Sequence, residues 1–175
     1  SGIISTTRSS VVMGGIATGN WTPAAEFNIL VDPEAAKIVF TSGVPITMAG
    51  LDVTEKALIL PEDFARVRAL GNPVSDIVAQ WLEFFYKFHR SIGYAGAPMH
   101  DPCAVMALIH PEIFTIRPMY VQVETGGEYC RGTTVGDLLG FSGHAPNADV
   151  LMDVDRSRFA DLLVEAIGFY GEAKA

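Results

Sequence analysis

Apolar and polar positions along the chain alternate in blocks typical of strands and helices taken in turn. Residues 11–13 form a short apolar run that ends in two glycines, which predicts a buried strand leading into a turn. Residues 33–41 have helical spacing, with Asp32 as the N-cap and Gly43 as the C-cap. Residues 44–53 predict a second strand. The first third of the chain therefore indicates a strand, a helix and a strand in order.

Three further helices are predicted in the middle of the chain. Residues 61–70 form a compact helical segment, and residues 74–92 form the longest periodic segment, rich in aromatic side chains. Residues 93–98 predict a flexible loop. Pro102 then opens an apolar helix that runs to about Ile109.

The last third of the chain predicts a hairpin, a strand and a helix. Residues 120–124 and 129–134 flank a turn-forming segment and predict a β-hairpin. Residues 138–147 are loop-like, residues 148–154 predict a last strand, and residues 158–170 predict an amphipathic helix. The alternation of elements predicts an α/β fold with a mainly parallel sheet flanked by helices and a late β-hairpin.

Length and charge narrow the class of protein. The 175 residues are 49% hydrophobic, which is enough for one domain with a substantial core, so we expect residues 1–175 to form a single domain. Twelve basic against twenty acidic residues give a net charge of -8 without a basic cluster. This charge argues against a nucleic acid polymer as a partner and favours a neutral small molecule or a cation.

The cysteines and the N-terminus indicate the compartment. Cys103 and Cys130 form no C-x-x-C pair, which favours a reduced, cytoplasmic setting and leaves one disulfide open. No window approaches the roughly eighteen apolar residues of a membrane span, and no signal-peptide layout is present, so no membrane partner is expected. Ser1-Gly2 without an initiating methionine is typical of residues left by cloning, and the chain continues as though it began partway through a fold.

The richest candidate chemistry lies in residues 19–34, G-N-W-T-P-A-A-E-F-N-I-L-V-D-P-E. We expect the aromatic rings of Trp21 and Phe27 to be buried there. The side chains able to hydrogen-bond sugar hydroxyls are Asn20, Thr22, Glu26 and Asn28. Such a mixture suits a small polar ligand.

Local signals predict where these polar groups lie. Thr22 is expected to cap a short helix whose first turn contains Pro23, which leaves Glu26 and Asn28 on a short connection between elements. Loops held by a rigid scaffold commonly carry function. The alternative is that the polar groups only cap helices and satisfy turns.

Two other places carry candidate chemistry. Phe84, Phe88 and Ile92 share one helical face, which either packs in a core, as spacing alone favours, or stacks on a planar base. His100 and Asp101 stand at a helix start after a flexible loop and supply a proton donor and an oxygen ligand together. The alternative is that Asp101 is only the helix cap and His100 an exposed loop residue.

Several segments together resemble one enzyme family. The run T-P-A-A-E-F-N-I-L-V-D-P-E-A-A, the preceding V-V-M-G-G and G-N, and the later G-L-D-V-T and H-D-P-C-A are similar in order and spacing to the calcium-dependent inosine-uridine nucleoside hydrolases. The resemblance covers nearly all of the chain. It implies hydrolysis of the N-glycosidic bond of a purine or pyrimidine nucleoside to ribose and free base.

The resemblance also implies roles for individual residues. Asn20, Glu26 and Asn28 resemble the ribose-hydroxyl binders of the family, and Met13 resembles the residue that packs near the sugar. His100 resembles the proton donor to the leaving base, and Asp101 resembles a calcium ligand. Phe84, Phe88 and Ile92 fall on the helix that approaches the base in relatives. Some members that recognise pyrimidines carry polar side chains or Tyr on that helix.

The chemistry gives these roles a physical reason. Hydrolysis builds positive charge on the sugar and negative charge on the departing base, so the site needs sugar clamps, an activated water and often a proton donor. In such a site a calcium ion binds both the vicinal hydroxyls and the attacking water.

The chain departs from the family at one motif. Family members carry an aspartate cluster, D-x-D-x-G-x-D-D, which supplies most calcium carboxylates, and this sequence has none. Ca²⁺ takes six to eight oxygens, so Asp101 alone is expected to form a weak site, and Asp52 is expected to be structural. We therefore expect the sugar and leaving-group side of a hydrolase site, inactive by itself.

Three interpretations stay open. The chain belongs to a nucleoside hydrolase, or it is a non-catalytic nucleoside-binding or interaction module derived from one, or it is a structural remnant that only folds and associates. An exposed sheet edge and apolar surface predict a homo-oligomer.

Overall fold

The computed structural model describes residues 10–14 and 19–172, and of residues 10–13 it describes the backbone alone. These residues form two compact units. The first holds the chain up to Thr54 together with His100–Val154, and the second holds Glu55–Met99 and the chain from Asp155 onward. The single domain predicted from length stays a prediction, since a division into compact units does not count domains. Ser1-Gly2 lies outside the described residues.

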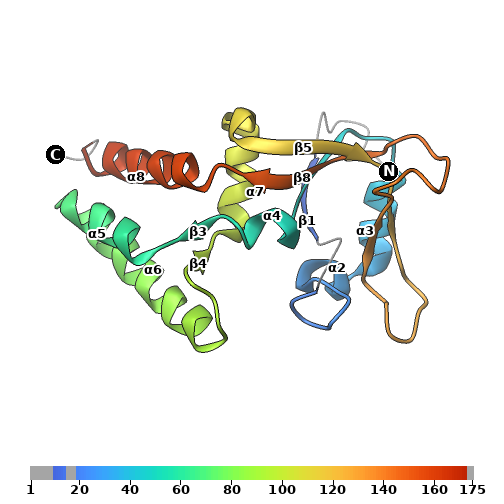
Figure 1. The fold of residues 1–175 in the computed structure, drawn as a ribbon, viewed down its shortest axis with the longest axis horizontal. Coiled ribbons are helices and arrows are strands. Elements are labelled where there is room, and N and C mark those ends of the chain that lie inside the picture. Colours follow the sequence, from blue (N-terminus) through green and yellow to red (C-terminus); the bar gives the residue numbers. More distant parts are fainter. Residues whose placement is uncertain (1–9, 15–18, 173–175) are drawn as a thin grey trace. The chain divides into compact units, whose positions relative to one another are not determined.

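The first unit is built on a four-stranded mixed sheet (Figure 1). Its order is β1-β2-β8-β5, formed by Ser10–Gly14, Ile46–Gly50, Ala148–Val154 and Phe114–Met119. β1 and β8 both run parallel to β2, while β5 is antiparallel to β8. The predicted mainly parallel sheet is confirmed.

Strand β5 was not predicted. Its inner positions, T-I-R-P, are all exposed, so the sequence lacks the alternation of apolar and polar residues that marks a half-buried strand. It also contains Pro118, which has no N–H to donate and is tolerated on an edge strand such as this one.

The predicted strand over residues 44–53 is wrong at its end. β2 stops at Gly50, and Leu51–Thr54 forms the short helix α4. Leu51, Val53 and Thr54 are buried in either conformation, so their apolar character did not distinguish a strand from a helical turn. The turn places Thr54 at the end of α4, beyond the carboxyl end of β2.

Helices α2 (Phe27–Val31) and α3 (Pro33–Phe40) precede β2. Asp32 caps α3 as predicted, because its side chain accepts the Ala35 N–H. The core of this unit lies between these helices and the strands, and consists of Ile29, Phe40, Ile46, Met48, Met119, Val121, Val123, Ala148 and Val150.

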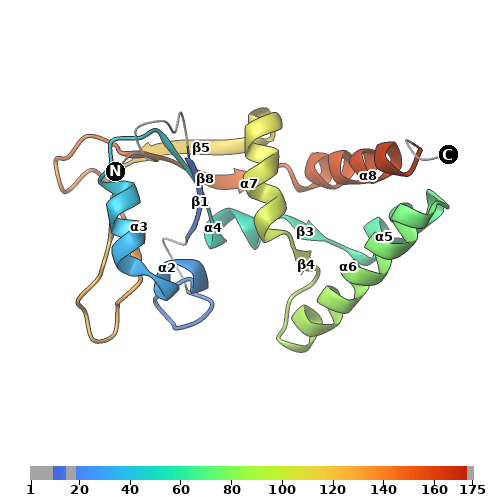
Figure 2. The ribbon, with the colours of Figure 1, turned by 180° about the vertical axis from the view of Figure 1, so that it is seen from behind.

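Helix α7 (His100–Ile109) packs against β1 and β2 and crosses in front of β8 in Figure 2. A 3-10 turn, η1 (Pro111–Ile113), follows it. The helix begins before Pro102, so the prediction of Asp101 as its cap is wrong. Asp101 lies in the first turn, where a carboxylate interacts favourably with the exposed N–H groups of the helix.

The late hairpin is present with a longer connection than predicted. β6 (Val121–Val123) pairs antiparallel with β7 (Thr134–Gly136), so the predicted return strand over residues 129–134 is wrong. Turns occupy the intervening residues, and Gly132 has a φ of 86°, which breaks strand geometry. Residues 138–147 form the predicted loop.

The described residues of the second unit form three helices and a small ribbon. α5 (Pro61–Ala69) and α6 (Pro73–Ser91) match their predictions, and α8 (Arg156–Glu172) begins slightly earlier than predicted. β3 (Leu58–Ile59) pairs antiparallel with β4 (Ala97–Pro98), within the segment predicted as a loop. Along residues 10–14 and 19–172, no helix combines the length and apolar character needed to cross a bilayer.

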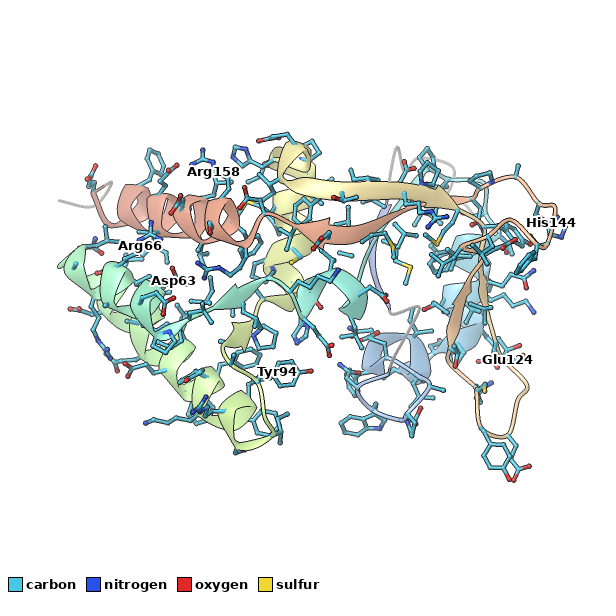
Figure 3. All side chains as sticks on the ribbon, in the orientation of Figure 1. Asp63, Arg66, Tyr94, Glu124, His144 and Arg158 are labelled. Atoms are coloured by element: carbon cyan, nitrogen blue, oxygen red, sulfur yellow. The ribbon has the colours of Figure 1, made fainter. Side chains whose placement is uncertain are left out.

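A charged cluster ties these helices together within the second unit. Asp63 of α5, labelled in Figure 3, is buried. It accepts the Leu60 N–H at 3.0 Å and pairs with Arg156 at 2.6 Å. Arg156 also donates to the Leu58 carbonyl at 3.2 Å. The Asp63–Arg156 pair therefore connects the start of α5, strand β3 and the start of α8.

Candidate functional site

A pocket of about 340 Å³ opens in the first unit where the start of α2 lies near the start of α7. It is lined by Asn20, Trp21, Glu26, Phe27, Asn28, His100 and Asp101. The structure thus brings together three of the residues predicted to bind sugar hydroxyls and the predicted His and Asp pair, from segments more than seventy positions apart.

Glu26 caps helix α2. The prediction that it lies on a connection between elements is wrong, because α2 begins at Phe27 and Glu26 is its buried N-cap. Its Oε2 accepts the N–H groups of Asn28 at 2.9 Å and Ile29 at 3.2 Å, and its Oε1 accepts Asn28 Nδ2 at 3.0 Å. A carboxylate has about four acceptor positions, so a ligand hydroxyl can still donate to it.

These bonds fix which way two amides face. A carboxylate only accepts hydrogen bonds, so Asn28 turns Nδ2 toward Glu26 and directs its acceptor Oδ1 the other way. Asn20 Oδ1 accepts the Phe27 N–H at 2.9 Å, so Nδ2 of Asn20 points away from Phe27 and is available as a donor. The pocket therefore offers an amide donor and an amide acceptor, and a sugar hydroxyl can bond to both.

The segment before α2 is a turn. Thr22 Oγ1 accepts the N–H groups of Ala24 and Ala25, so the predicted helix containing Pro23 is wrong. Gly19 allows the fold-back, since a Cβ there would collide with the backbone of Thr22 and Ala25. Thr22 therefore only satisfies a turn, which was the alternative to sugar binding.

Trp21 and Phe27 are exposed, and their predicted burial is wrong. Trp21 is 68% exposed and Phe27 is 43% exposed. Their rings meet edge to face with centroids 5.1 Å apart at the wall of the pocket. An apolar composition predicted a core position, but the short turn holds both rings on the surface.

His100 stands in the first turn of α7 and is half-buried. Its Nδ1 lies 2.9 Å from Oγ1 of Thr54, which is fully buried at the end of α4. Thr54 could not be singled out from the sequence, because a Thr after G-L-D-V also suits a buried helix end. Only the packing of α4 against α7 brings the hydroxyl to the ring.

The carboxylates of the described residues do not assemble a metal site. Asp101 is exposed, and in the part of the chain that the structure describes no three His, Cys, Asp or Glu side chains are placed to hold one ion. Ca²⁺ takes six to eight oxygens, so this donor set does not fit a complete calcium site.

The remaining predicted site residues are not among those that line this pocket. The backbone of Met13 pairs with Ala49 between β1 and β2, and its side chain is not among those described. Phe84, Phe88 and Ile92 belong to the second unit and are 80%, 60% and 57% exposed. The alternative that they pack in a core is wrong.

The two cysteines take no part in the pocket. Both are free thiols, with Cys130 exposed and Cys103 buried in α7. Burial raises the pKa of Cys103 to about 12, so this side chain stays a neutral thiol and is unsuited to nucleophilic attack.

Comparison with known proteins agrees with the fold and with the family that the sequence resembles. A family model described as inosine-uridine preferring nucleoside hydrolase matches residues 2–161. The pyrimidine-specific ribonucleoside hydrolase RihA of Escherichia fergusonii is 57% identical over 163 residues, which are 91% of this chain and 52% of the relative. RihA of Salmonella enteritidis is 56% identical over the same shares.

Solved structures of nucleoside hydrolases have a similar fold. A purine-preferring ribonucleoside hydrolase from Gardnerella vaginalis superimposes with a TM-score of 0.82 at 31% identity, over 94% of this chain and 53% of the other. The plant nucleoside hydrolase PpNRh1 superimposes with a TM-score of 0.77 at 30% identity, over 89% and 52%. The chain thus spans about half the length of these relatives. With a matching family model over most of its residues and the same fold, the chain belongs to the inosine-uridine preferring nucleoside hydrolase family.

Proposed function

We propose that this chain carries the sugar and leaving-group side of a ribonucleoside hydrolase site, which acts on the N-glycosidic bond of a nucleoside. One observation carries the proposal. The pocket of the first unit collects oriented amides, a buried carboxylate and an imidazole around one space. Hydroxyl binding and proton donation are two of the tasks that release of a base from ribose places on protein side chains.

The sugar is held by Asn20, Glu26 and Asn28. The outward Nδ2 of Asn20 donates to a sugar oxygen, while Asn28 Oδ1 and the remaining acceptor positions of Glu26 receive hydroxyl protons. Because Glu26 also caps α2, the sugar-binding side chains are fixed to a helix end. Little conformational entropy is therefore lost when the sugar binds.

The departing base gains negative charge as the bond breaks, and His100 supplies a proton to it. The imidazole lines the same pocket as the start of α2, within the same unit. General acid catalysis of this kind contributes about a hundredfold to ten-thousandfold in rate. The contact of Phe84, Phe88 and Ile92 with the base stays a prediction from the family resemblance, because these residues belong to the second unit.

Calcium is proposed only as a weakly held ion in the isolated chain. Asp101 offers one carboxylate, and the described residues supply no cluster around it. A lone carboxylate with backbone and water oxygens falls short of the usual coordination. No catalytic step is therefore assigned to the ion here, and the isolated chain is expected to be inactive.

Pyrimidine nucleosides are the proposed substrates. RihA, named pyrimidine-specific, is 57% identical to this chain, whereas the purine-preferring enzyme from Gardnerella vaginalis is 31% identical. Uridine is therefore the first ligand to test, with inosine as the comparison.

The experiment measures uridine binding and ribose release by the purified chain, with and without added Ca²⁺. We expect uridine to bind and Asn28→Ala to weaken the binding about tenfold, the effect of one lost hydrogen bond with its partner left unpaired. The matched control is Gln122→Ala, which removes an exposed amide on β6 and leaves the affinity unchanged.

Two outcomes would overturn parts of the proposal. A folded chain that binds neither uridine nor inosine has no sugar site. Calcium-dependent ribose release that disappears in His100→Ala means that the metal and water side is present after all, so inactivity of the isolated chain is wrong.

A second function is supported by the carboxylate arrangement. A chain that keeps an oriented sugar pocket without a carboxylate cluster among its described residues suits a non-catalytic nucleoside-binding module. This function is favoured over hydrolysis if uridine binds with an affinity that Ca²⁺ does not change, and if no oligomeric form of the chain releases ribose.

A further inference from the structure

The contact between Thr54 and His100 joins the end of α4 to the start of α7. Thr54 Oγ1 lies 2.9 Å from His100 Nδ1, and the Thr54 side chain is fully buried. The bond forms across 46 positions of sequence, so it reflects the packing of the two helices.

The burial of Thr54 decides which group donates. Among the described residues, the Thr54 hydroxyl has His100 Nδ1 as its hydrogen-bonding partner and no other. If Nδ1 carried the proton and donated to Oγ1, the hydroxyl hydrogen would be buried without an acceptor, which is costly. The hydroxyl therefore donates, and Nδ1 accepts.

A neutral imidazole that accepts at Nδ1 carries its proton on Nε2. Nε2 lies on the opposite edge of the ring from Thr54, and His100 lines the pocket. The nitrogen able to release a proton is then the one away from the buried hydroxyl.

We propose that Thr54 is a positioning residue, which fixes the neutral His100 ring in the Nε2–H form and holds that N–H toward the leaving base. The proposal rests on the proposed function for its purpose, but the bond and the tautomer belong to the folded chain and exist without substrate. Thr54 is not among the residues that line the pocket, so it acts through His100.

The experiment is ¹⁵N NMR of the imidazole nitrogens at mildly alkaline pH, with the His100 signals assigned by their loss in His100→Ala. In the unaltered chain we expect Nδ1 to give the signal of an unprotonated nitrogen and Nε2 that of a protonated one. Thr54→Val keeps the shape and removes the hydroxyl, and we expect the tautomer ratio to move about fivefold to tenfold toward Nδ1–H, the effect of one hydrogen bond. Thr54→Ser restores the original ratio.

Thr134→Val is the matched control, because Thr134 is equally buried but lies on β7. It should leave the His100 signals unchanged. A protonated Nδ1 in the unaltered chain, or the same tautomer ratio in Thr54→Val, overturns the proposal. If Thr54→Val does not fold, the unaltered chain and Thr54→Ser still decide it. Uridine binding is measured separately, so a chain with the expected tautomer and no uridine binding refutes the proposed function and not the bond.

Discussion

Glu26 combines a structural and a proposed ligand-binding task in one side chain. Its carboxylate satisfies two N–H groups at the start of α2 and also turns the Asn28 amide. An exposed Glu would not hold Asn28 in one orientation, because solvent would compete for both groups. The burial of Glu26 is therefore what makes the Asn28 acceptor a fixed part of the pocket.

At the residue scale, Glu26→Ala is expected to destabilise the chain by about 1–3 kcal/mol. The change removes the cap of α2 and leaves buried N–H groups without an acceptor. Urea unfolding followed by circular dichroism measures the loss.

Glu34→Ala is the control for this measurement. Glu34 pairs with Arg131 on the surface, where the guanidinium lowers the pKa of the carboxyl but solvent screens the attraction. Its removal should change the unfolding midpoint much less. Equal effects of the two substitutions would contradict the capping role of Glu26.

At the element scale, the second unit depends on a buried carboxylate at the start of α5. Asp63 is 2% exposed at its side chain and pairs with Arg156, while Arg66 links α5 to Asp161 of α8 on the surface. The same pair of helices is thus joined by one buried and one exposed ion pair.

Asp63→Ala is expected to cost about 3 kcal/mol of unfolding free energy. The substitution leaves the Arg156 guanidinium partly buried without its carboxylate and removes the acceptor for the Leu60 N–H. Thermal unfolding monitored on the helical signal measures the effect.

Asp161→Ala removes the exposed partner on the same helix pair and should have a several-fold smaller effect. If both variants unfold at the same temperature, Asp63 does not connect these elements in the way described.

At the scale of the whole molecule, one apolar stripe stays exposed. Ile77, Trp81, Phe84, Phe88 and Ile92 recur along α6 and its C-cap at helical spacing, and each is between 48% and 80% exposed. Contiguous exposed apolar surface of this kind marks an interaction site or a tendency to associate. It supports the homo-oligomer that the sequence predicts.

Light scattering is expected to give a mass above the 18.8 kDa of one chain. The double substitution Trp81→Gln and Phe84→Gln should shift the sample toward that monomer mass, because it removes two large rings from the stripe. Phe169→Gln, which removes an exposed ring from α8, is the control. A monodisperse monomer for the unaltered chain would contradict the prediction.

The helices were predictable where local signals are strong. Asp32, Asn72 and the prolines that follow each of them mark the starts of α3 and α6, and these side chains do accept N–H groups of the first turn. Predictions were wrong where neighbouring segments set the conformation, as in α4, where buried apolar residues suit a strand and a helical turn equally.

The features of the candidate site also differ in whether local sequence or packing determines them. The segment with Asn20, Glu26 and Asn28 and the His100–Asp101 pair were predictable as chemical candidates, because hydroxyl-binding and proton-donating groups cluster there. The sequence did not reveal the exposure of Trp21 or the contact of Thr54 with His100, since both depend on what packs beside them.

The sequence by itself determined the α/β class, the order of most elements and the family resemblance, because these follow from periodicity, capping residues and the spacing of motifs along the chain. Only the tertiary structure decided which polar groups meet in one pocket, which way the amides of Asn20 and Asn28 face, and which nitrogen of His100 meets Thr54. The physical reason is that hydrogen-bond direction and burial are properties of neighbours in space, and a linear sequence does not state who those neighbours are.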